Sequence, residues 1–353
     1  MAKMLMKGNE AVAQAAIRAG CDAFFGYPIT PQNEVPEYLS RELPKAGGVF
    51  VQAESEVAAI NMVYGAAGAG ARVMTSSSSP GISLKQEGIS YIAGAELPAV
   101  IVNMVRGGSG LGSIQASQCD YYQATRGGGN GDYRTLVYAP ANVQEAADLV
   151  MEAFDVADYY RNPVVVLGDG MIGQMMEPVE FRERSKRKLK EKTWAASGTK
   201  GKREHNVINS LRLDPEELEV LNDKLQAKYE MMEKDEARCE MYKMENPEIV
   251  FVAYGTTSRI VKNAIDLLEA EGITAGLIRP ITLYPFPKKA FDEIPETAKG
   301  IIGVEMSEGQ IMDDIEISNK GRFPTRFYGR AGGVIPKPKE IVDVAKSMIG
   351  GGR

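Results

Sequence analysis

The spacing of apolar and polar residues predicts a chain in which strands and helices alternate. Residues 98–105 and 163–167 are almost wholly apolar, which is typical of central parallel strands buried on both faces. Residues 143–157 repeat apolar side chains with the period of an amphipathic helix, and Asn142 is placed to cap it. Further strands are expected at 22–25, 49–52, 71–75 and 135–138, and further helices at 8–19, before 43, from about 55 and at 82–95. The chain up to residue 180 is therefore predicted to be a doubly wound α/β domain.

Two further segments follow this domain. Residues 181–247 hold a dense basic run and then a charged helical pattern with sparse apolar positions, so we expect a charged helical linker. A docking surface for a partner subunit is the alternative interpretation of the same pattern. From residue 248 a second α/β domain is predicted, with strands at 249–254, 275–278 and 300–305 and helices at 259–271 and 340–348. The predicted organisation is thus 1–180, 181–247 and 248–353.

One acidic residue lies where the helical pattern predicts apolar side chains. The helix that begins near Ser55 places Glu56 on the same stripe as Ile60, Val63 and Ala67. A carboxylate that faces a core must be paired, protonated or functional. The alternative is that Glu56 only supplies the negative charge that favours a helix N-terminus.

Polar side chains follow several of the predicted strands, where the carboxyl ends of a parallel sheet bind ligands. Pro28 and Pro31 stiffen a loop that presents Thr30, and Arg106 ends the strand at 98–105, where it could hold a carboxylate. Residues 78–81, Ser-Ser-Pro-Gly, could contact an anion or a cofactor through backbone N–H groups. A helix cap at Thr30, a salt bridge at Arg106 and a plain loop at 78–81 are the alternatives.

Composition narrows the classes of function. The chain has 353 residues, 44% hydrophobic and 25% charged, and a net charge of −6, which argues against a nucleic-acid surface. We expect no membrane span and no signal peptide, because no apolar run is long enough. The three cysteines are scattered, which predicts a reducing, cytoplasmic setting and no iron–sulfur cluster within this chain. One histidine excludes a His-rich metal site, so no metal ligands are predicted.

Several motifs in one order point to a known family. They are Tyr27-Pro28-Ile29-Thr30-Pro31, Glu54-Ser55-Glu56, Ser78-Ser79-Pro80-Gly81, Arg106-Gly107-Gly108, Gly131-Asp132-Tyr133-Arg134, Leu277-Ile278-Arg279-Pro280 and Pro285-Phe286-Pro287. In this order the chain resembles the alpha-type subunit of the 2-oxoacid:ferredoxin oxidoreductases, over nearly its whole length. The resemblance implies a thiamine diphosphate pyrimidine-binding domain followed by a domain like the C-terminal domain of transketolase.

The resemblance also implies roles for individual residues. Glu56 corresponds to the catalytic glutamate that hydrogen-bonds the aminopyrimidine ring and relays a proton. Thr30 and Arg106 correspond to ligands of the substrate carboxylate. The remaining cofactor contacts are expected from Pro28, Ile29, Ser78, Pro80 and Gly81.

The family's diphosphate and metal motif is incomplete in this chain. Gly168-Asp169-Gly170 resembles its start, but the required asparagine is missing, so we interpret these residues as the end of a strand. The resemblance then implies that thiamine diphosphate is shared with a diphosphate-binding, beta-type subunit that carries Mg2+. It also implies a gamma-type subunit, a ferredoxin-like iron–sulfur subunit with 4Fe-4S clusters, ferredoxin as electron acceptor and coenzyme A as co-substrate.

The loop after Arg106 bears on the substrate. It reads Arg-Gly-Gly-Ser-Gly-Leu-Gly, which resembles the branched-chain subfamily, and Leu111 would suit an apolar substrate side chain. The expected reaction is oxidative decarboxylation of 2-oxoisovalerate (3-methyl-2-oxobutanoate) to acyl-CoA and CO2. The first alternative is the 2-oxoglutarate enzyme of the same family. The alternatives of another class are a non-catalytic assembly subunit and a nucleotide-binding protein, although residues 107–112 do not match the dinucleotide-binding glycine spacing.

Overall fold

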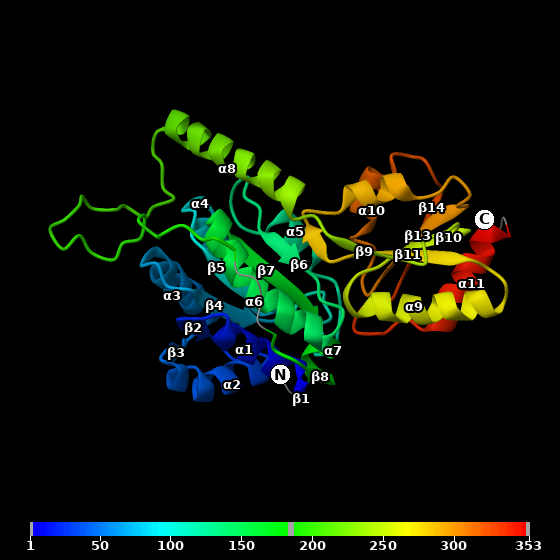
Figure 1. Ribbon diagram of the computed structural model, residues 1–353, viewed down its shortest axis with the longest axis horizontal. Helices are drawn as coiled ribbons and strands as arrows, with labels where there is room; N and C mark the ends of the chain where they lie inside the picture. The colour runs from blue at the N-terminus through cyan, green and yellow to red at the C-terminus, as the bar shows by residue number, and fades with distance from the viewer. Residues whose placement is uncertain (1–2, 183–186, 351–353) are drawn as a thin grey trace.

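The first lobe of the molecule is built on one mostly parallel sheet. The computed structural model describes residues 3–182 and 187–350, and Figure 1 shows them as two lobes with the long helix α8 above the first. Among the described residues the first sheet has seven strands in the order β12-β6-β7-β5-β4-β2-β3, all parallel to their neighbours except β12, which runs antiparallel to β6. The strands are β2 (Ala23–Gly26), β3 (Val49–Gln52), β4 (Val73–Ser77), β5 (Ala99–Val105), β6 (Leu136–Tyr138), β7 (Pro163–Asp169) and β12 (Thr282–Tyr284).

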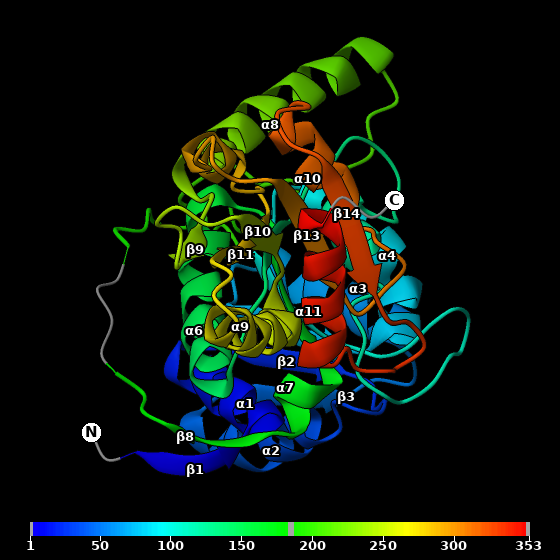
Figure 2. The ribbon, with the colours of Figure 1, turned by 90° about the vertical axis from the view of Figure 1, so that its right-hand side faces the viewer.

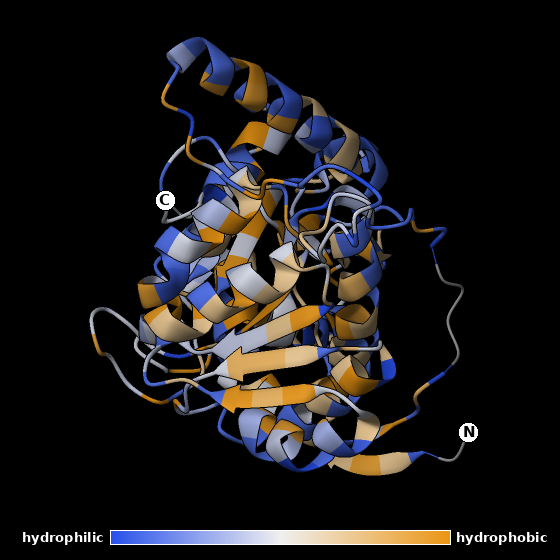
Figure 3. Ribbon diagram, turned by 90° about the vertical axis from the view of Figure 1, so that its left-hand side faces the viewer, coloured by the Kyte–Doolittle hydropathy of each residue, from blue (hydrophilic) through white to orange (hydrophobic). Residues whose placement is uncertain are grey.

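Helices cover both faces of this sheet, which explains the continuous apolar runs in its central strands. Val100 and Val102 of β5 belong to a core with α1 and α6, while Ile101 of the same strand belongs to a core with α3 and α4. Figure 3 shows the strands mostly in orange and α8 with alternating colours along its length. The helices of this lobe are α1 (Gly8–Arg18), α2 (Glu34–Glu42), η1 (Pro44–Ala46), α3 (Glu56–Gly68), α4 (Ser79–Gly94), α5 (Tyr121–Arg126), α6 (Val143–Tyr160) and α7 (Gly170–Gln174).

The second lobe repeats the layered design on a smaller scale. Its sheet has the order β14-β13-β10-β11-β9, in which β9 alone is antiparallel to its neighbour, and α9 and α11 pack on one face (Figures 1 and 2). The strands are β9 (Cys239–Tyr242), β10 (Ile249–Val252), β11 (Ala275–Pro280), β13 (Gly300–Glu305) and β14 (Thr325–Gly329). The helices are α9 (Gly255–Ala270), η2 (Lys288–Glu293), α10 (Met312–Asn319) and α11 (Pro338–Ile349).

The segment between the lobes is anchored to the first lobe. Helix α8 (Pro215–Asp235) is capped by Asp214 and buries Leu225, Tyr229 and Met232 in the core that contains α1 and α6. The expected helix in this charged segment is therefore confirmed, and its sparse apolar positions are the ones that it buries. A short antiparallel pair, β1 (Met4–Lys7) with β8 (Met176–Val179), closes the lower edge of the lobe (Figure 2).

The two lobes exchange strands. β9 precedes residue 248 in the chain but joins the second sheet, and β12 follows it but joins the first sheet beside β6. Most strands predicted from the sequence are present, and those at 49–52 and 300–305 have the predicted bounds. The short strands β1, β8, β9, β12 and β14 were not predicted, because their apolar runs are brief and all five lie at sheet edges.

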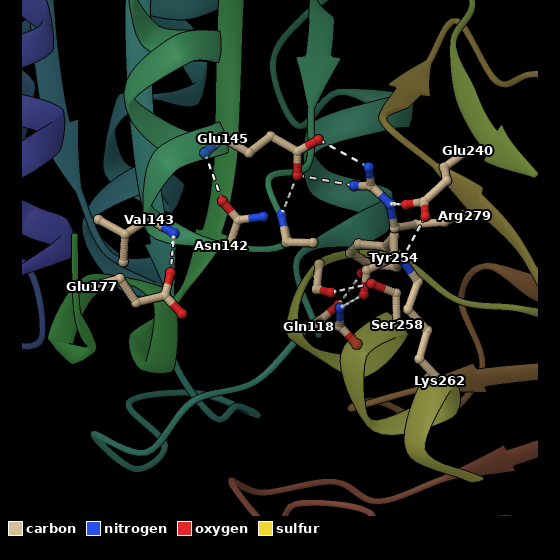
Figure 4. Close-up of polar contacts among 12 residues, drawn as sticks. Gln118, Asn142, Val143, Glu145, Glu177, Glu240, Tyr254, Ser258, Lys262 and Arg279 are labelled. Atoms are coloured by element: carbon tan, nitrogen blue, oxygen red, sulfur yellow. Dashed lines mark hydrogen bonds and ion pairs between the residues drawn. The ribbon is translucent and has the colours of Figure 1, made fainter. Parts of the chain in front are cut away.

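Ion pairs fix the junction of the lobes. Figure 4 shows Arg279, at the end of β11, pointing toward Glu145 of α6. Its Nη1 and Nη2 donate to the two carboxylate oxygens of Glu145 at 2.9 and 3.0 Å, and its Nε donates to Glu240 at 2.6 Å. The side chain of Arg279 is only 8% exposed, so the pair is a buried contact between the lobes.

Candidate functional site

Glu56 lies at the first turn of α3, at the carboxyl edge of the first sheet. Ser55 caps the helix, since its Oγ accepts a hydrogen bond from the backbone N–H of Ala58 at 3.2 Å. Glu56 is 7% exposed, and Ile60 and Val63 on the same stripe are buried as well. The predicted placement of a carboxylate on a core-facing stripe is therefore confirmed.

Gly81 leaves room for the Glu56 carboxylate. A Cβ at position 81 would lie 2.7 Å from Glu56 Oε1 and 2.1 Å from Ser77 Oγ, distances at which neither atom could stay in place. Gly81 is in the first turn of α4, so the ends of α3 and α4 meet at this carboxylate. A side chain at this position would displace Glu56.

The start of α4 holds buried polar atoms that find no partner within the protein. Ser77 Oγ and Ser78 Oγ are buried without a hydrogen bond among the described residues. The backbone N–H of Ser79, by contrast, is satisfied by Asn103 Oδ1 at 3.1 Å. Buried hydroxyls normally have a partner, so the two unpaired ones fit a polar group bound from outside the chain.

Arg106 connects two of the predicted loops. Its Nη1 donates to the backbone oxygen of Thr30 at 3.0 Å and its Nη2 to that of Leu111 at 3.0 Å. Its Nε is buried without a partner among the described residues. The structure thus brings Thr30, Arg106 and Leu111 together, and the guanidinium keeps N–H groups for a further acceptor.

The other predicted residues surround this arrangement with different exposure. Thr30 and Pro28 are exposed, Ile29 and Pro80 are half-buried, and Leu111 is 78% exposed. A cavity of about 480 Å³ opens beside Thr30 and is lined by Ile114, Met171 and Ile335 among others. A larger groove of about 580 Å³ lies elsewhere, between α3, α4 and α8, and is lined by none of the residues predicted to bind substrate or cofactor.

A buried lysine beside the site was missed by sequence reasoning. Lys85 of α4 is 0% exposed, and its Nζ donates to Thr75 Oγ1 at 2.7 Å and to the backbone oxygen of Ser76 at 3.0 Å. Burial lowers the pKa of Lys85 to about 7, and the negative charge of Glu56 opposes this shift. The available signal was its position four residues after Gly81, on the face of α4 that turns toward α3.

Asp169 has a structural role that agrees with the predicted strand end. It is the last residue of β7, and its carboxylate accepts hydrogen bonds from the backbone N–H groups of Met171 and Ile172. In the described ranges no group of three or more His, Cys, Asp or Glu side chains is arranged to hold a metal ion. None of the helices in those ranges is long and apolar enough to cross a membrane.

Comparison with known protein families shows which family has this fold and site. A family model described as "Pyruvate flavodoxin/ferredoxin oxidoreductase, thiamine diP-bdg" matches residues 14–250, and one described as "Pyruvate:ferredoxin oxidoreductase core domain II" matches residues 247–341. The protein is therefore of the thiamine diphosphate-binding oxidoreductase class, as the motif order predicted. The chain belongs to the 2-oxoacid:ferredoxin oxidoreductase family.

Two curated relatives have names that describe different substrates. The chain is 50% identical over 350 residues to ketoisovalerate oxidoreductase subunit VorB of Methanothermobacter marburgensis, covering 99% of both chains. It is 41% identical over 320 residues to 2-oxoglutarate synthase subunit KorA of Archaeoglobus fulgidus, covering 88% of this chain and 90% of the relative. One relative is named as a subunit of an oxidoreductase and the other as a subunit of a synthase.

Solved structures share the whole architecture. The 2-oxoglutarate:ferredoxin oxidoreductase from Magnetococcus marinus, with 2-oxoglutarate, coenzyme A and succinyl-CoA bound, has a TM-score of 0.88 at 28% identity. The match covers 98% of this chain but 65% of that one, so this chain spans about two thirds of its length. A split-gene transketolase shares the fold over 99% of both chains, with a TM-score of 0.61 at 14% identity. The predicted fold class, a thiamine-binding domain followed by a transketolase-like domain, is confirmed.

Proposed function

We propose that this chain is the pyrimidine-binding subunit of a ferredoxin-dependent 2-oxoacid oxidoreductase that acts on 2-oxoisovalerate. The observation that carries the proposal is Glu56, a buried carboxylate at the junction of α3 and α4 in a domain of the thiamine diphosphate-binding family. The products would be CO2 and the branched-chain acyl-CoA.

The residues around Glu56 fit thiamine diphosphate. When bound, the cofactor supplies the carbanion chemistry that lets a 2-oxoacid lose CO2. Glu56 would hold and move a proton at its carboxylate, and Gly81 would keep the space beside it open. The unpaired hydroxyls of Ser77 and Ser78 provide polar contacts in the same place, next to Pro28, Ile29 and Pro80 in the adjoining loops.

Arg106 and Thr30 would orient the carboxylate of the 2-oxoacid. Arg106 already fixes the loop that presents Thr30, so both groups are held before substrate arrives. The unpaired Nε and the spare N–H groups of the guanidinium supply donors in a fixed plane, which suits a carboxylate.

A branched-chain substrate is favoured over 2-oxoglutarate by the comparison and by Leu111. Identity is 50% to the ketoisovalerate subunit and 41% to the 2-oxoglutarate subunit. Arg106 binds the backbone oxygen of Leu111, and an apolar side chain at this position would give a second substrate carboxylate no polar partner. The 2-oxoglutarate reaction is the second candidate, favoured by the 2-oxoglutarate enzyme of similar structure.

Other chains would complete the active site. Val57 and Met62 of α3 and Leu84 and Tyr91 of α4 are between 39% and 55% exposed, and they lie on the two helices whose first turns meet at Glu56. Exposed apolar side chains on these two helices fit a subunit interface. We propose that the beta-type subunit binds there and carries the diphosphate site and Mg2+. A gamma-type and an iron–sulfur subunit would supply the 4Fe-4S clusters, ferredoxin would accept the electrons, and coenzyme A would take the acyl group.

A cytoplasmic setting fits the cysteines. Cys21, Cys119 and Cys239 are all free thiols. Burial raises the pKa of the Cys21 thiol to about 12, so it stays protonated and unreactive at neutral pH.

The test is Glu56→Gln in the complex assembled with the partner subunits. Reduction of a viologen dye with coenzyme A and a panel of 2-oxoacids should fall by more than 100-fold, while the subunit composition stays that of the wild type. Glu54→Gln is the matched control, because Glu54 is exposed two residues earlier and should keep full activity. Near wild-type turnover of Glu56→Gln would refute the role of this carboxylate.

The same panel decides the substrate. 2-Oxoisovalerate should give the highest kcat/KM, and a higher value for 2-oxoglutarate would establish the second candidate instead. Absence of turnover with every 2-oxoacid in an intact complex would leave only an assembly role.

A further inference from the structure

Lys85 is a buried charge without a directly hydrogen-bonded carboxylate among the described residues. Its Nζ is bound by the hydroxyl of Thr75 and the backbone oxygen of Ser76, and the Thr75 hydroxyl donates in turn to the backbone oxygen of Phe25 at 2.6 Å. Burying an ammonium group with only neutral partners is costly, so a structural role alone would be served as well by an apolar side chain.

The packing of two helices places Lys85 close to Glu56. In α4, Gly81, Lys85 and Gly88 are spaced by four and three residues and so lie on one face. A Cβ on Gly81 would touch Glu56 Oε1, and a Cβ on Gly88 would lie 2.6 Å from the side chain of Ile60. Glu56 and Ile60 are one turn apart on α3. Lys85 therefore lies in the seam between the two helices, bracketed by these contacts.

Glu56 is also the charged group that interacts electrostatically with Lys85. It is the one charge that shifts the pKa of Lys85, and it acts against the effect of burial. The two groups that bind the ammonium both come from β4 and are neutral: the hydroxyl of Thr75 and the backbone carbonyl of Ser76. In a seam closed to water, the attraction between an ammonium and a carboxylate is much stronger than at the surface.

We propose that Lys85 is a positioning residue for Glu56, whose ionised carboxylate it stabilises from behind whenever the glutamate has given up its proton. This inference rests on the proposed function, in which Glu56 moves a proton at the cofactor. Lys85 touches neither substrate nor cofactor in this role. Its fixed ammonium supplies a positive charge near the Glu56 carboxylate in a site that excludes water.

The experiment compares Lys85→Met with the wild type in two forms of the protein. In the assembled complex, the acidic limb of the pH profile of kcat/KM should move to higher pH by one unit or more. In the full chain labelled with 13C-glutamate, the carboxyl resonance of Glu56, assigned by its absence in Glu56→Gln, should titrate at correspondingly higher pH. Methionine has nearly the same length and is apolar, so the packing of the seam is kept.

Three further variants serve as controls. Lys289→Met carries the same change at an exposed lysine and should move neither readout. Thr75→Val removes one acceptor of the ammonium and should move both readouts in the same direction as Lys85→Met, but by less, whereas Thr75→Ser keeps the hydroxyl and should not.

Each outcome has one meaning. A folded Lys85→Met variant with an unchanged pH profile and an unchanged Glu56 resonance would overturn the inference and leave Lys85 a structural residue. If Glu56→Gln is fully active, the proposed role of Glu56 fails, whatever Lys85 does. If Glu56→Gln is inactive and Lys85→Met moves both readouts, both proposals stand.

Discussion

The guanidinium of Arg106 holds the backbone of Thr30, with 3.0 Å between Nη1 and the carbonyl oxygen, although 76 residues separate the two in the chain. Arg106→Lys should raise the KM for the 2-oxoacid about tenfold or more, because an ammonium cannot bind Thr30 and Leu111 at once and still face a substrate carboxylate. Steady-state kinetics of the complex measure this effect. The affinity for thiamine diphosphate should change less, and an unchanged KM would contradict the assignment.

Leu111 should influence which 2-oxoacid is preferred. Leu111→Ala removes apolar surface beside Arg106, so kcat/KM for 2-oxoisovalerate should fall roughly 10-fold or more, while the value for pyruvate changes little. The ratio of the two values is the measurement. Leu211→Ala, at another exposed leucine, should leave the ratio unchanged, and equal losses for both substrates would count against a role in specificity.

Glu305 should make stability depend on pH near neutrality. Burial raises its pKa from 4.5 to about 7, although the hydroxyls of Ser307 and Tyr254 and the N–H of Ile311 partly oppose this. Because the folded state holds the proton longer, the stabilisation is full below about pH 4.5 and is lost as the pH rises through 7. Glu305→Gln should therefore lose less stability than the wild type between pH 5 and 8.

Thermal unfolding of the full chain at several pH values measures the effect of Glu305. Glu308→Gln is the control, since this nearby glutamate is exposed, and it should follow the wild type. Parallel curves for Glu305→Gln and the wild type would show that the carboxyl group does not titrate in this range.

Lys85 should make the stability of the fold rise with pH, opposite to the effect of Glu305, and at higher pH. Its pKa in the folded chain, about 7, lies below the ordinary value of 10.5, so the unfolded chain binds more protons between these values. Stability should accordingly rise with pH from about 7 to 10. Lys85→Met should lack this rise and should exceed the wild type most at pH 7 and below. A rise equal to that of the wild type would show that the ammonium is not the source.

The pair Arg279 and Glu145 should contribute to the stability of the lobe junction. Arg279→Met takes from Glu145 its guanidinium partner and leaves Glu240 paired with Lys262, and breaking a buried ion pair in this way typically costs about 3 kcal/mol, or several degrees in Tm. Lys299→Met breaks an exposed pair with Glu248 and should cost about 0.5 kcal/mol or less. Equal losses in the two variants would show that burial of the Arg279 pair is energetically unimportant.

Local patterns predicted the elements whose sequence repeats a simple period. The apolar run at 98–105 and the cap at Asn142 depend on neighbours in sequence, and β5 and α6 appear where expected. Glu56 could be singled out because a carboxylate on an apolar stripe is costly in any fold. The family resemblance then supplied the cofactor, which no period or spacing could have indicated.

The features that the sequence did not predict depend on contacts between segments far apart in the chain. α4 begins at Ser79, three residues before the apolar period does, because Asn103 from another strand binds the first N–H of the helix. Lys85 was not singled out from the sequence, since nothing nearby in the chain reveals that Thr75 and Ser76 of β4 enclose it. The short strands β9 and β12 are stable only because the opposite lobe provides their partners.

The strand exchange has a practical consequence for anyone who wishes to cut the protein in two. A fragment that stops at residue 247 keeps β9 without the sheet it joins and exposes the edge of β6, and the remaining fragment lacks β9 and carries β12 with nothing to pair with. Unpaired edges of this kind favour aggregation. A cut in the exposed stretch around Gly198 and Gly201 would keep β9 in the same fragment as its sheet, so that the pair of β12 with β6 is the strand pairing left to form between the fragments. Split reporters and paired-fragment expression should therefore be designed there.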